Sequence, residues 1–412
     1  MKTFLWAFAV IAPILVAGAV TPSTANAQSL QELDRSLLFP SNADIAAGET
    51  LATDACGACH SSDGVAADPA LPHLAGQHAV YLYTELLAYK DGRREAESMS
   101  SVLAFLSDDA LRKVSSYYAN LSPPEPAAPA ASSDGAVADV AASDPVQLGM
   151  AAAAGCGGCH GASGNSQMAG MPSLTAQSPE YFVAAMRAYQ QGGRQGSMMS
   201  SFAASVNEEA VQNMALYYAL QKPQRSAAGG SGDVDAGRAA AQACSTCHGA
   251  DGNITSADTP TLAGQDAVYL ASSLQAYAEG KRDHAPMVTA TADLSDADVE
   301  ALASFYAQQE PITRKVHQPP TIAEWIERCD RCHGIGGNST NPRNPSLASQ
   351  NEAYLARVIE TYADGGRDNS IMSAMSQPLR PSDIAGLAAH YAAQKRKSIL
   401  YVELPCAAAN DE

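Results

Sequence analysis

Apolar side chains recur at helical spacing through much of the chain. The clearest stretch has apolar residues at positions 81, 82, 86 and 89 and closes at Gly92. A second stretch follows the capping sequence Leu-Ser-Asp-Asp at 106–109 and predicts a last helix that runs to Tyr118. No alternating apolar and polar run with hairpin turns is found along the sequence. The pattern therefore predicts an all-α fold.

The longest apolar run stands at the N-terminus, from Phe4 to Val20, after Lys2 and before the small residues that end at Ala27. This order is typical of a secretory signal, so we predict a signal peptide at residues 1–27, cleaved near Ala27, and a periplasmic mature protein. An uncleaved membrane anchor is the alternative, although the run contains Pro13 and is short for a bilayer span. No second run of spanning length follows, so we expect membrane association only through partners.

The chain contains four copies of one unit. Each begins with Cys-x-x-Cys-His and continues, in matching register, with a proline, a glutamine, two tyrosines eight residues apart, an arginine and a methionine. The proline lies 12 residues and the methionine 39 residues after the histidine in every copy. The motif cysteines are Cys56, Cys59, Cys156, Cys159, Cys244, Cys247, Cys329 and Cys332; the histidines His60, His160, His248 and His333; the prolines Pro72, Pro172, Pro260 and Pro345; and the methionines Met99, Met199, Met287 and Met372.

Compositional breaks separate the copies. We predict domains at residues 41–122, 144–222, 233–310 and 319–398, linkers at 123–143 and 223–232, and a C-terminal tail at 399–412. The first linker is rich in Pro, Ala and Ser, and the second in Gly and Ser. Domains of this size bury little apolar surface, so a metal or a covalent cofactor would help to stabilise them.

Cys-x-x-Cys-His is the attachment signature of c-type haem. One helical turn places both thiols where they can form thioethers with the two haem vinyl groups, and the adjacent histidine faces the iron. A zinc site and a redox dithiol are the alternatives, but either would leave the repeated histidine and methionine without a role. We therefore predict four covalently bound haem c groups, with the four motif histidines as axial ligands.

The four methionines in register are the predicted sixth ligands, because a thioether is a soft donor suited to haem iron. The alternative is that they are core side chains. Met198 and Met375 stand close enough in sequence to substitute for Met199 and Met372, and the register favours the latter two. We expect the four prolines to lie beside the haem, each carbonyl accepting a hydrogen bond from the ligand histidine, unless they only form turns.

The other repeated positions carry weaker predictions. The tyrosines are expected to be core aromatics on one helix face, with a role as electron relays as the alternative. The arginines either neutralise haem propionates or are solvated surface residues. His73, His78, His284, His317 and His390 have no repeated counterparts and are read as ordinary histidines; His284 lies close to Met287 in sequence. Cys406 is the ninth cysteine, expected to be an unpaired thiol or an intermolecular bridge.

The formal charge of the chain is −18, which excludes nucleic acid as an expected partner. From Pro311 onward the chain has 11 basic and 11 acidic residues, so the whole deficit lies before that point. The asymmetry predicts different partners at the two ends of the chain. An acidic surface that only keeps the protein soluble is the alternative.

The combination of Cys-x-x-Cys-His-Gly, Pro-x-Leu-x-x-Gln, Tyr-x-x-Gly-x-Arg, the methionine and a closing Tyr-Tyr-Ala-type helix resembles the cytochrome c4 family of dihaem class I cytochromes, in duplicated form. The resemblance implies class I domains in pairs with neighbouring haem edges, and electron delivery to a terminal oxidase or another periplasmic acceptor. It does not say how the two halves pack. The first copy departs from the pattern with Ser61 in place of glycine, and the fourth has Trp325 but no first-helix glycine.

Two ligands at each iron leave no open position for a substrate, so we predict an electron-transfer protein and no catalytic residues. Its predicted partners are a quinol-oxidising complex and a terminal oxidase, or a periplasmic reductase or dehydrogenase, docked on the acidic first and third copies. One alternative is the cytochrome subunit of a periplasmic dehydrogenase, or a haem peroxidase with one labile methionine. Another is a structural, filament-forming haem protein.

Overall fold

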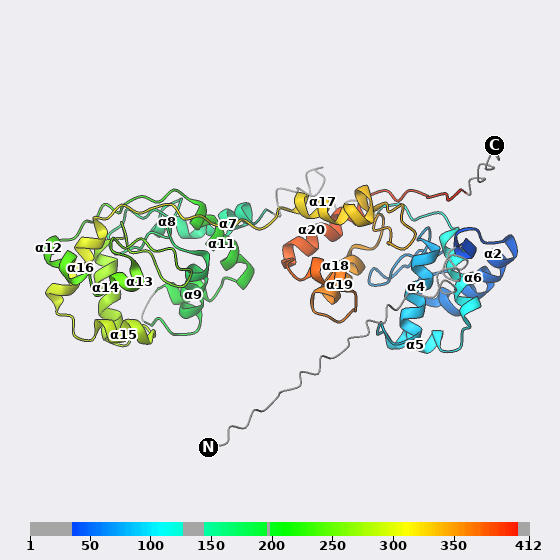
Figure 1. Cartoon of the computed structure of the whole chain (residues 1–412), viewed down its shortest axis with the longest axis horizontal. Helices are drawn as coiled ribbons and strands as arrows, with labels where there is room; N and C mark the ends of the chain where they lie inside the picture. The colour runs from blue at the N-terminus through cyan, green and yellow to red at the C-terminus, as the bar shows by residue number, and fades with distance from the viewer. Residues whose placement is uncertain (1–34, 127–143, 196–197, 403–412) are drawn as a thin grey trace, which may run out of the picture.

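The computed structural model describes residues 35–126, 144–195 and 198–402. The predicted signal peptide, most of the first linker and Cys406 lie outside these residues. The elements described are helices, apart from two isolated backbone bridges. They form four helical units in chain order (Figure 1), which we name by the bounds predicted from the sequence: unit 1 (residues 41–122), unit 2 (144–222), unit 3 (233–310) and unit 4 (319–398).

The four units share one order of elements. A first helix leads into the Cys-x-x-Cys-His turn, and three further helices follow. The bounds are α2 Asn42–Leu51, η1 Ala52–Cys56, α3 Gly57–His60, α4 Ala79–Lys90, α5 Glu97–Leu103 and α6 Asp108–Ala119 in unit 1; α7 Pro145–Ala153, η3 Ala154–Cys156, α8 Gly157–His160, α9 Pro179–Gln190, α10 Met199–Ala203 and α11 Glu208–Leu220 in unit 2; α12 Val234–Ala240, α13 Ser245–His248, α14 Ala267–Ala278, α15 Ala285–Thr291 and α16 Asp296–Ala307 in unit 3; and α17 Ile322–His333, η4 Ile335–Gly337, α18 Glu352–Ala363, α19 Ser370–Ser376 and α20 Pro381–Ala392 in unit 4.

Local sequence signals set the helix ends. Ser107 caps α6, its hydroxyl accepting the Ala110 N–H at 3.2 Å, so the predicted last helix is confirmed. Asn207 and Ser295 cap the equivalent helices α11 and α16 in the same way. The apolar stretch around 81–89 is α4, which ends just before Gly92 at a φ of 72°.

The first and last helices of units 1 to 3 cross at a glycine. A Cβ at Gly48 would lie 2.2 Å from the Lys113 carbonyl oxygen, and one at Gly149 would lie 2.1 Å from that of Asn213. Gly237 is equally close to α16. These helices therefore touch backbone to backbone. In unit 4, where the glycine is absent, the buried indole of Trp325 packs in the core beside α20 instead.

The units pair out of chain order. Unit 2 packs on unit 3 to give an inner pair, whereas unit 1 packs on unit 4 to give an outer pair, so one pair is inserted in the sequence between the two halves of the other. Figure 1 shows the two pairs as separate lobes, with α7 to α16 in one and α2 to α6 together with α17 to α20 in the other. This nested arrangement is the main feature that the sequence did not predict.

The repeated glutamines hold each pair together. In the outer pair the Gln77 side chain donates to the Ser346 carbonyl at 2.9 Å and accepts its N–H at 2.9 Å, and Gln350 does the same with His73 at 3.0 and 2.7 Å. The inner pair has the same reciprocal bonds, between Gln177 and Thr261 (2.8 and 3.0 Å) and between Gln265 and Ser173 (2.9 and 2.8 Å). Each pair is therefore built with approximate two-fold symmetry.

The two pairs meet through units 2 and 4. Arg380, at the start of α20, donates to the Asn213 side-chain oxygen on α11 at 3.2 Å, and the Ser382 N–H donates to Glu209 at 3.2 Å. Along the long axis the units follow the order 3, 2, 4, 1 (Figure 1). Units 1 and 3 are thus the ends of the molecule.

Candidate haem sites

Each motif histidine is fixed by the proline predicted for it. The histidine Nδ1–H donates to the carbonyl of the proline 12 residues on, at 3.2 Å in unit 1, 2.8 Å in unit 2, 3.1 Å in unit 3 and 2.9 Å in unit 4. Burial lowers the pKa of all four imidazoles, against a smaller opposing effect of this bond. A neutral ring with its Nδ1 so occupied presents Nε2 as a metal ligand.

The motif cysteines have the same setting in every unit. The first thiol is half-buried and the second is exposed, and none forms a disulfide. Burial raises the pKa of the first thiols, Cys56, Cys156 and Cys244, and raises that of Cys329 to about 11. A redox dithiol needs an attacking thiol of lowered pKa, so this setting argues against that alternative. It fits thiols committed to a covalent link.

The turn after each histidine uses positive φ. Gly161, Gly249 and Gly334 have φ values of 78°, 79° and 76°, and Ser61 takes the same position at 59°. A side chain at positive φ is strained, yet the turn of unit 1 keeps the shape of the other three. Ser61 therefore does not disrupt the first site.

The four methionines in register lie at equivalent places, in the short third helix of each unit. Met99, Met199, Met287 and Met372 are all half-buried. Met198 is 71% exposed, whereas Met199 packs against the core of unit 2, so the structure favours Met199 at this site. Met375 packs in the core of unit 4. Assignment of the four methionines as iron ligands stays a prediction.

The repeated arginines lie between paired units. Arg94 faces Arg367 in the outer pair, and Arg194 faces Arg282 in the inner pair, each couple joined by an antiparallel backbone bridge. Arg194 and Arg367 are buried, with 8% and 6% of their surface exposed. The reading of these arginines as solvated surface residues is therefore wrong. They stack on the repeated tyrosines, for example Arg94 at 4.3 Å from the ring centre of Tyr89.

The two arginine couples differ in their counter-charge. In the outer pair the Glu85 carboxylate binds Arg94 at 2.7 Å and Arg367 at 2.6 Å. In the inner pair no ion pair is found for Arg194 or Arg282 in the described part of the chain. Burial opposes ionisation of Tyr269 there, but the Arg282 and Arg194 guanidiniums outweigh it and lower the pKa of this phenol. The inner couple is thus the more electropositive of the two.

Two histidines read as ordinary from the sequence lie in the outer interface. The His78 Nε2–H donates to the Ser339 carbonyl at 3.0 Å, and its Nδ1 accepts the Tyr401 hydroxyl at 3.2 Å. Burial lowers the pKa of His78, as does the nearby Arg396 guanidinium, while the bond to Ser339 acts in the other direction. His73 binds Gln350 through its backbone. His73 and His78 have no counterparts in the other units because they serve contacts of the outer pair only.

Arg396 is a buried cation of the outer pair. It donates to the carbonyls of Ala348 (2.7 Å) and Ser346 (3.4 Å) in unit 4 and of Ala75 (3.0 Å) in unit 1. Burial lowers its pKa to about 10. Its guanidinium joins the two units by backbone acceptors alone, a contact for which the sequence offered no signal.

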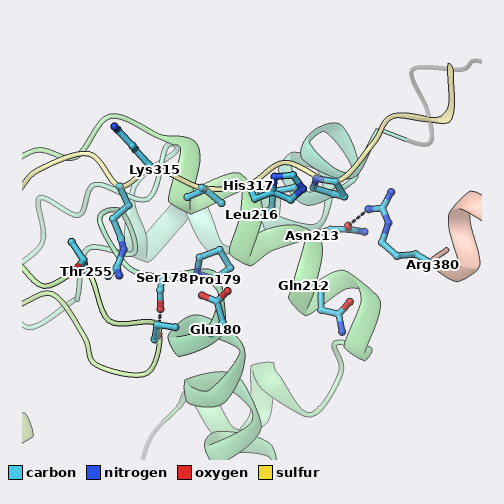
Figure 2. A pocket seen from close by; sticks show the side chains of 14 residues that line it. Ser178, Pro179, Glu180, Gln212, Asn213, Leu216, Thr255, Lys315, His317 and Arg380 are labelled. Carbon is cyan, nitrogen blue, oxygen red and sulfur yellow. Dashed lines mark hydrogen bonds between the residues drawn. The ribbon is translucent and has the colours of Figure 1, made fainter. Parts of the chain in front are cut away.

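A cavity of about 410 Å³ lies where the two pairs meet. Figure 2 shows Lys315, His317 and Arg380 around it, with Arg380 reaching Asn213. Two of the cations that line the cavity already have partners: Arg380 pairs with Asp383 at 2.6 Å, and Arg314 donates to the Ser256 carbonyl at 2.7 Å. None of the motif cysteines or histidines lines it. The cavity is therefore separate from the four repeated sites.

Comparison with known proteins gives a consistent result. The family model described as Cytochrome c matches residues 45–122 and 234–309. Cytochrome c4 of Pseudomonas aeruginosa is 33% identical over 176 residues, which are 39% of this chain and 88% of that protein. The thiosulfate dehydrogenase electron acceptor of Thiomonas intermedia is 33% identical over 150 residues, 33% of this chain and 69% of that protein.

Among solved structures, reduced cytochrome c4 from Pseudomonas stutzeri is 26% identical to this chain, with a TM-score of 0.37. The alignment covers 40% of this chain and 98% of the cytochrome c4 chain. The helical units and their repeated cysteine and histidine motifs define a multihaem c-type cytochrome. The chain belongs to the cytochrome c family and is c4-like, with four covalently bound haem c groups. Both of these relatives align with well under half of this chain.

Proposed function

We propose that this c4-like protein is a periplasmic electron carrier that links a quinol-oxidising complex to a terminal oxidase or another acceptor, and that it is not itself an enzyme. The observation that carries the proposal is the presence of both a histidine and a methionine in register in every unit. The names of the relatives support it, since one is an electron acceptor and others are c4 cytochromes. No helix of the described residues is long and apolar enough to cross a membrane.

When bound, each haem supplies an iron that accepts and returns one electron. The chain supplies the rest of each site. The two cysteines anchor the group, and the proline carbonyl orients the histidine by holding its Nδ1–H. The methionine thioether would be the second protein ligand of the iron, and a site with both ligands in place would exclude small molecules. Small structural change between the two charge states is the expected advantage of such closed sites.

A second candidate is the electron-accepting partner or subunit of a periplasmic dehydrogenase. The specific observation in its favour is the similarity to the thiosulfate dehydrogenase electron acceptor. Both candidates transfer electrons and differ only in the donor. Reduction of the purified protein by a quinol-oxidising complex, compared with reduction by a sulfur-compound dehydrogenase, distinguishes them.

Carbon monoxide binding to the fully reduced, haem-loaded protein tests the proposal. Closed histidine and methionine sites take up no gas, and the absorption spectrum stays unchanged. Uptake by about one haem in four would indicate an open iron and a catalytic centre, as in the peroxidase alternative. That result would contradict a pure carrier.

Acidic docking can be tested on unit 3. Asp293 and Asp296 are exposed, and their charge reversal is expected to slow association with a basic partner and to flatten its salt dependence. Asp298 is a poor target, because its carboxylate accepts from the Ser295 N–H and hydroxyl and so caps α16. Unchanged association kinetics would refute docking through this face.

A further inference from the structure

The contacts between units define which haems are neighbours. Within the pairs, unit 1 touches unit 4 through Gln77 and Gln350, and unit 2 touches unit 3 through Gln177 and Gln265. Electron tunnelling slows steeply with distance, so transfer is fastest between units that share such an interface. The first and second units, which are consecutive in the chain, share no hydrogen bond or ion pair in the described part of the molecule.

Between the pairs, the hydrogen bonds join unit 4 to unit 2. They run from Arg380 to Asn213, which Figure 2 shows, and from the Ser382 N–H to Glu209, so the start of α20 meets the first half of α11. Arg380 is held in place for this contact by Asp383, which binds its Nη2 at 2.6 Å and its Nε at 2.8 Å. A continuous series of contacts therefore runs from unit 1 through units 4 and 2 to unit 3.

The charge of the units follows the same spatial order. Unit 1 has 11 acidic and 5 basic residues, and unit 3 has 12 and 3. Unit 2 has 4 acidic and 3 basic residues, and unit 4 has 8 and 9. The acidic units are thus the two ends of the molecule, and the nearly neutral units meet in the middle, where strong like charge would oppose their contact.

We propose that electrons cross the molecule in the order unit 1, unit 4, unit 2, unit 3, or the reverse, and not in the order of the chain. Units 1 and 3 are then the ports for two basic redox partners, and the contact between α20 and α11 is the crossing between the pairs. In each step one iron is oxidised and the next is reduced by one electron, with no proton required. This inference rests on the proposed electron-carrier function.

The test uses the full-length, haem-loaded protein with a ruthenium polypyridyl photosensitiser on Glu97→Cys of unit 1, in a Cys406→Ser background. A sacrificial reductant in solution regenerates the sensitiser after each flash, so electrons enter at unit 1. Met372→His and Met287→His are the matched variants, one in unit 4 and one in unit 3. A second histidine ligand lowers the potential of that haem and marks it by its spectrum, because methionine ligation holds the potential higher.

The two orders give different counts of rapidly reduced haems. If the spatial order is right, Met372→His slows reduction of the haems in units 2 and 3 on the order of tenfold, the factor that 59 mV represents for one electron. Met287→His then leaves units 4 and 2 at the wild-type rate. If electrons follow the chain, Met372→His leaves units 2 and 3 fast, whereas Met287→His leaves only unit 2 fast, and the inference is wrong.

A variant with all four ligand sets intact tests the crossing itself. Glu209→Lys places a cation against Arg380 and the N-terminus of α20, and it is expected to slow transfer between the pairs on the order of tenfold. Glu208→Lys, with the same charge change one residue away, is the control: it disturbs the exposed pair with Arg187 and the bond from the Gln212 side chain, both within unit 2. Equal rates in the two variants would contradict the crossing. Failure of the wild type to reduce any haem beyond unit 1 would contradict the carrier function instead.

Discussion

Replacement of Gln77 by alanine is expected to loosen the outer pair and leave the inner pair intact. The side chain is 4% exposed and satisfies three backbone groups: the Ser346 N–H, the Ser346 carbonyl and the His78 N–H. A buried polar group without a partner costs about 1–3 kcal/mol, and the Ser346 carbonyl keeps a long bond from Arg396. We therefore expect a loss of at least about 2 kcal/mol in the free energy of opening of the interface.

Amide hydrogen exchange measures this loss. The Ser346 N–H should exchange roughly thirtyfold faster in Gln77→Ala than in the wild type, because about 1.4 kcal/mol corresponds to a factor of ten. The Thr261 N–H, held by Gln177 in the inner pair, is the internal control and should not change. Unchanged protection at Ser346, or equal loss at Thr261, would refute the nested pairing as the source of stability.

Three further predictions concern single positions. Gly149→Ala should destabilise unit 2 by about 1–3 kcal/mol in thermal unfolding, because its Cβ would lie 2.1 Å from a backbone oxygen of α11; the control Gly193→Ala meets nothing closer than 3.7 Å. His78→Asn should flatten the acid dependence of outer-pair stability in denaturant melts. Burial holds the pKa of folded His78 below 6.5, so the neutral imidazole contributes its full stability above pH 6.5. Below pH 6.5 the free energy of unfolding of the wild type then falls by up to about 1.4 kcal/mol per pH unit. If the stability of the variant falls with pH as steeply as that of the wild type, His78 is not the group that titrates. Glu85→Gln should raise the reduction potentials of the outer pair by roughly tens of millivolts in a redox titration, with exposed Glu97→Gln unchanged.

The helical units could be predicted because their signals are local. Ser107 and the apolar face of α4 lie within a few residues of the structures they produce. The link from His60 to Pro72 spans 12 residues and was expected from the fixed spacing of the copies. Repetition in four copies separates such a constraint from coincidence, so the haem motif could be read from one sequence.

The pairing of the units could not be predicted, because it depends on surfaces that repeat identically. Gln77 and Gln177 stand in the same register, and nothing in the sequence says which copy each will meet. The arginines illustrate the same limit, since Arg194 reads as a surface residue until unit 3 covers it. His73 and Arg396 carry no repeated signal at all, yet both lie in the outer interface.

The nested arrangement has a consequence for biogenesis. Contacts of the outer pair join residues far apart in sequence, such as Gln77 with Ser346, 269 residues later. A chain that emerges N-terminus first would expose the interface of unit 1 until unit 4 has followed, whereas the inner pair can close as soon as unit 3 is complete. Unit 1 is therefore the part most exposed to proteases and to wrong pairing during maturation, and a truncation that removes unit 4 should harm the first unit more than its immediate neighbour.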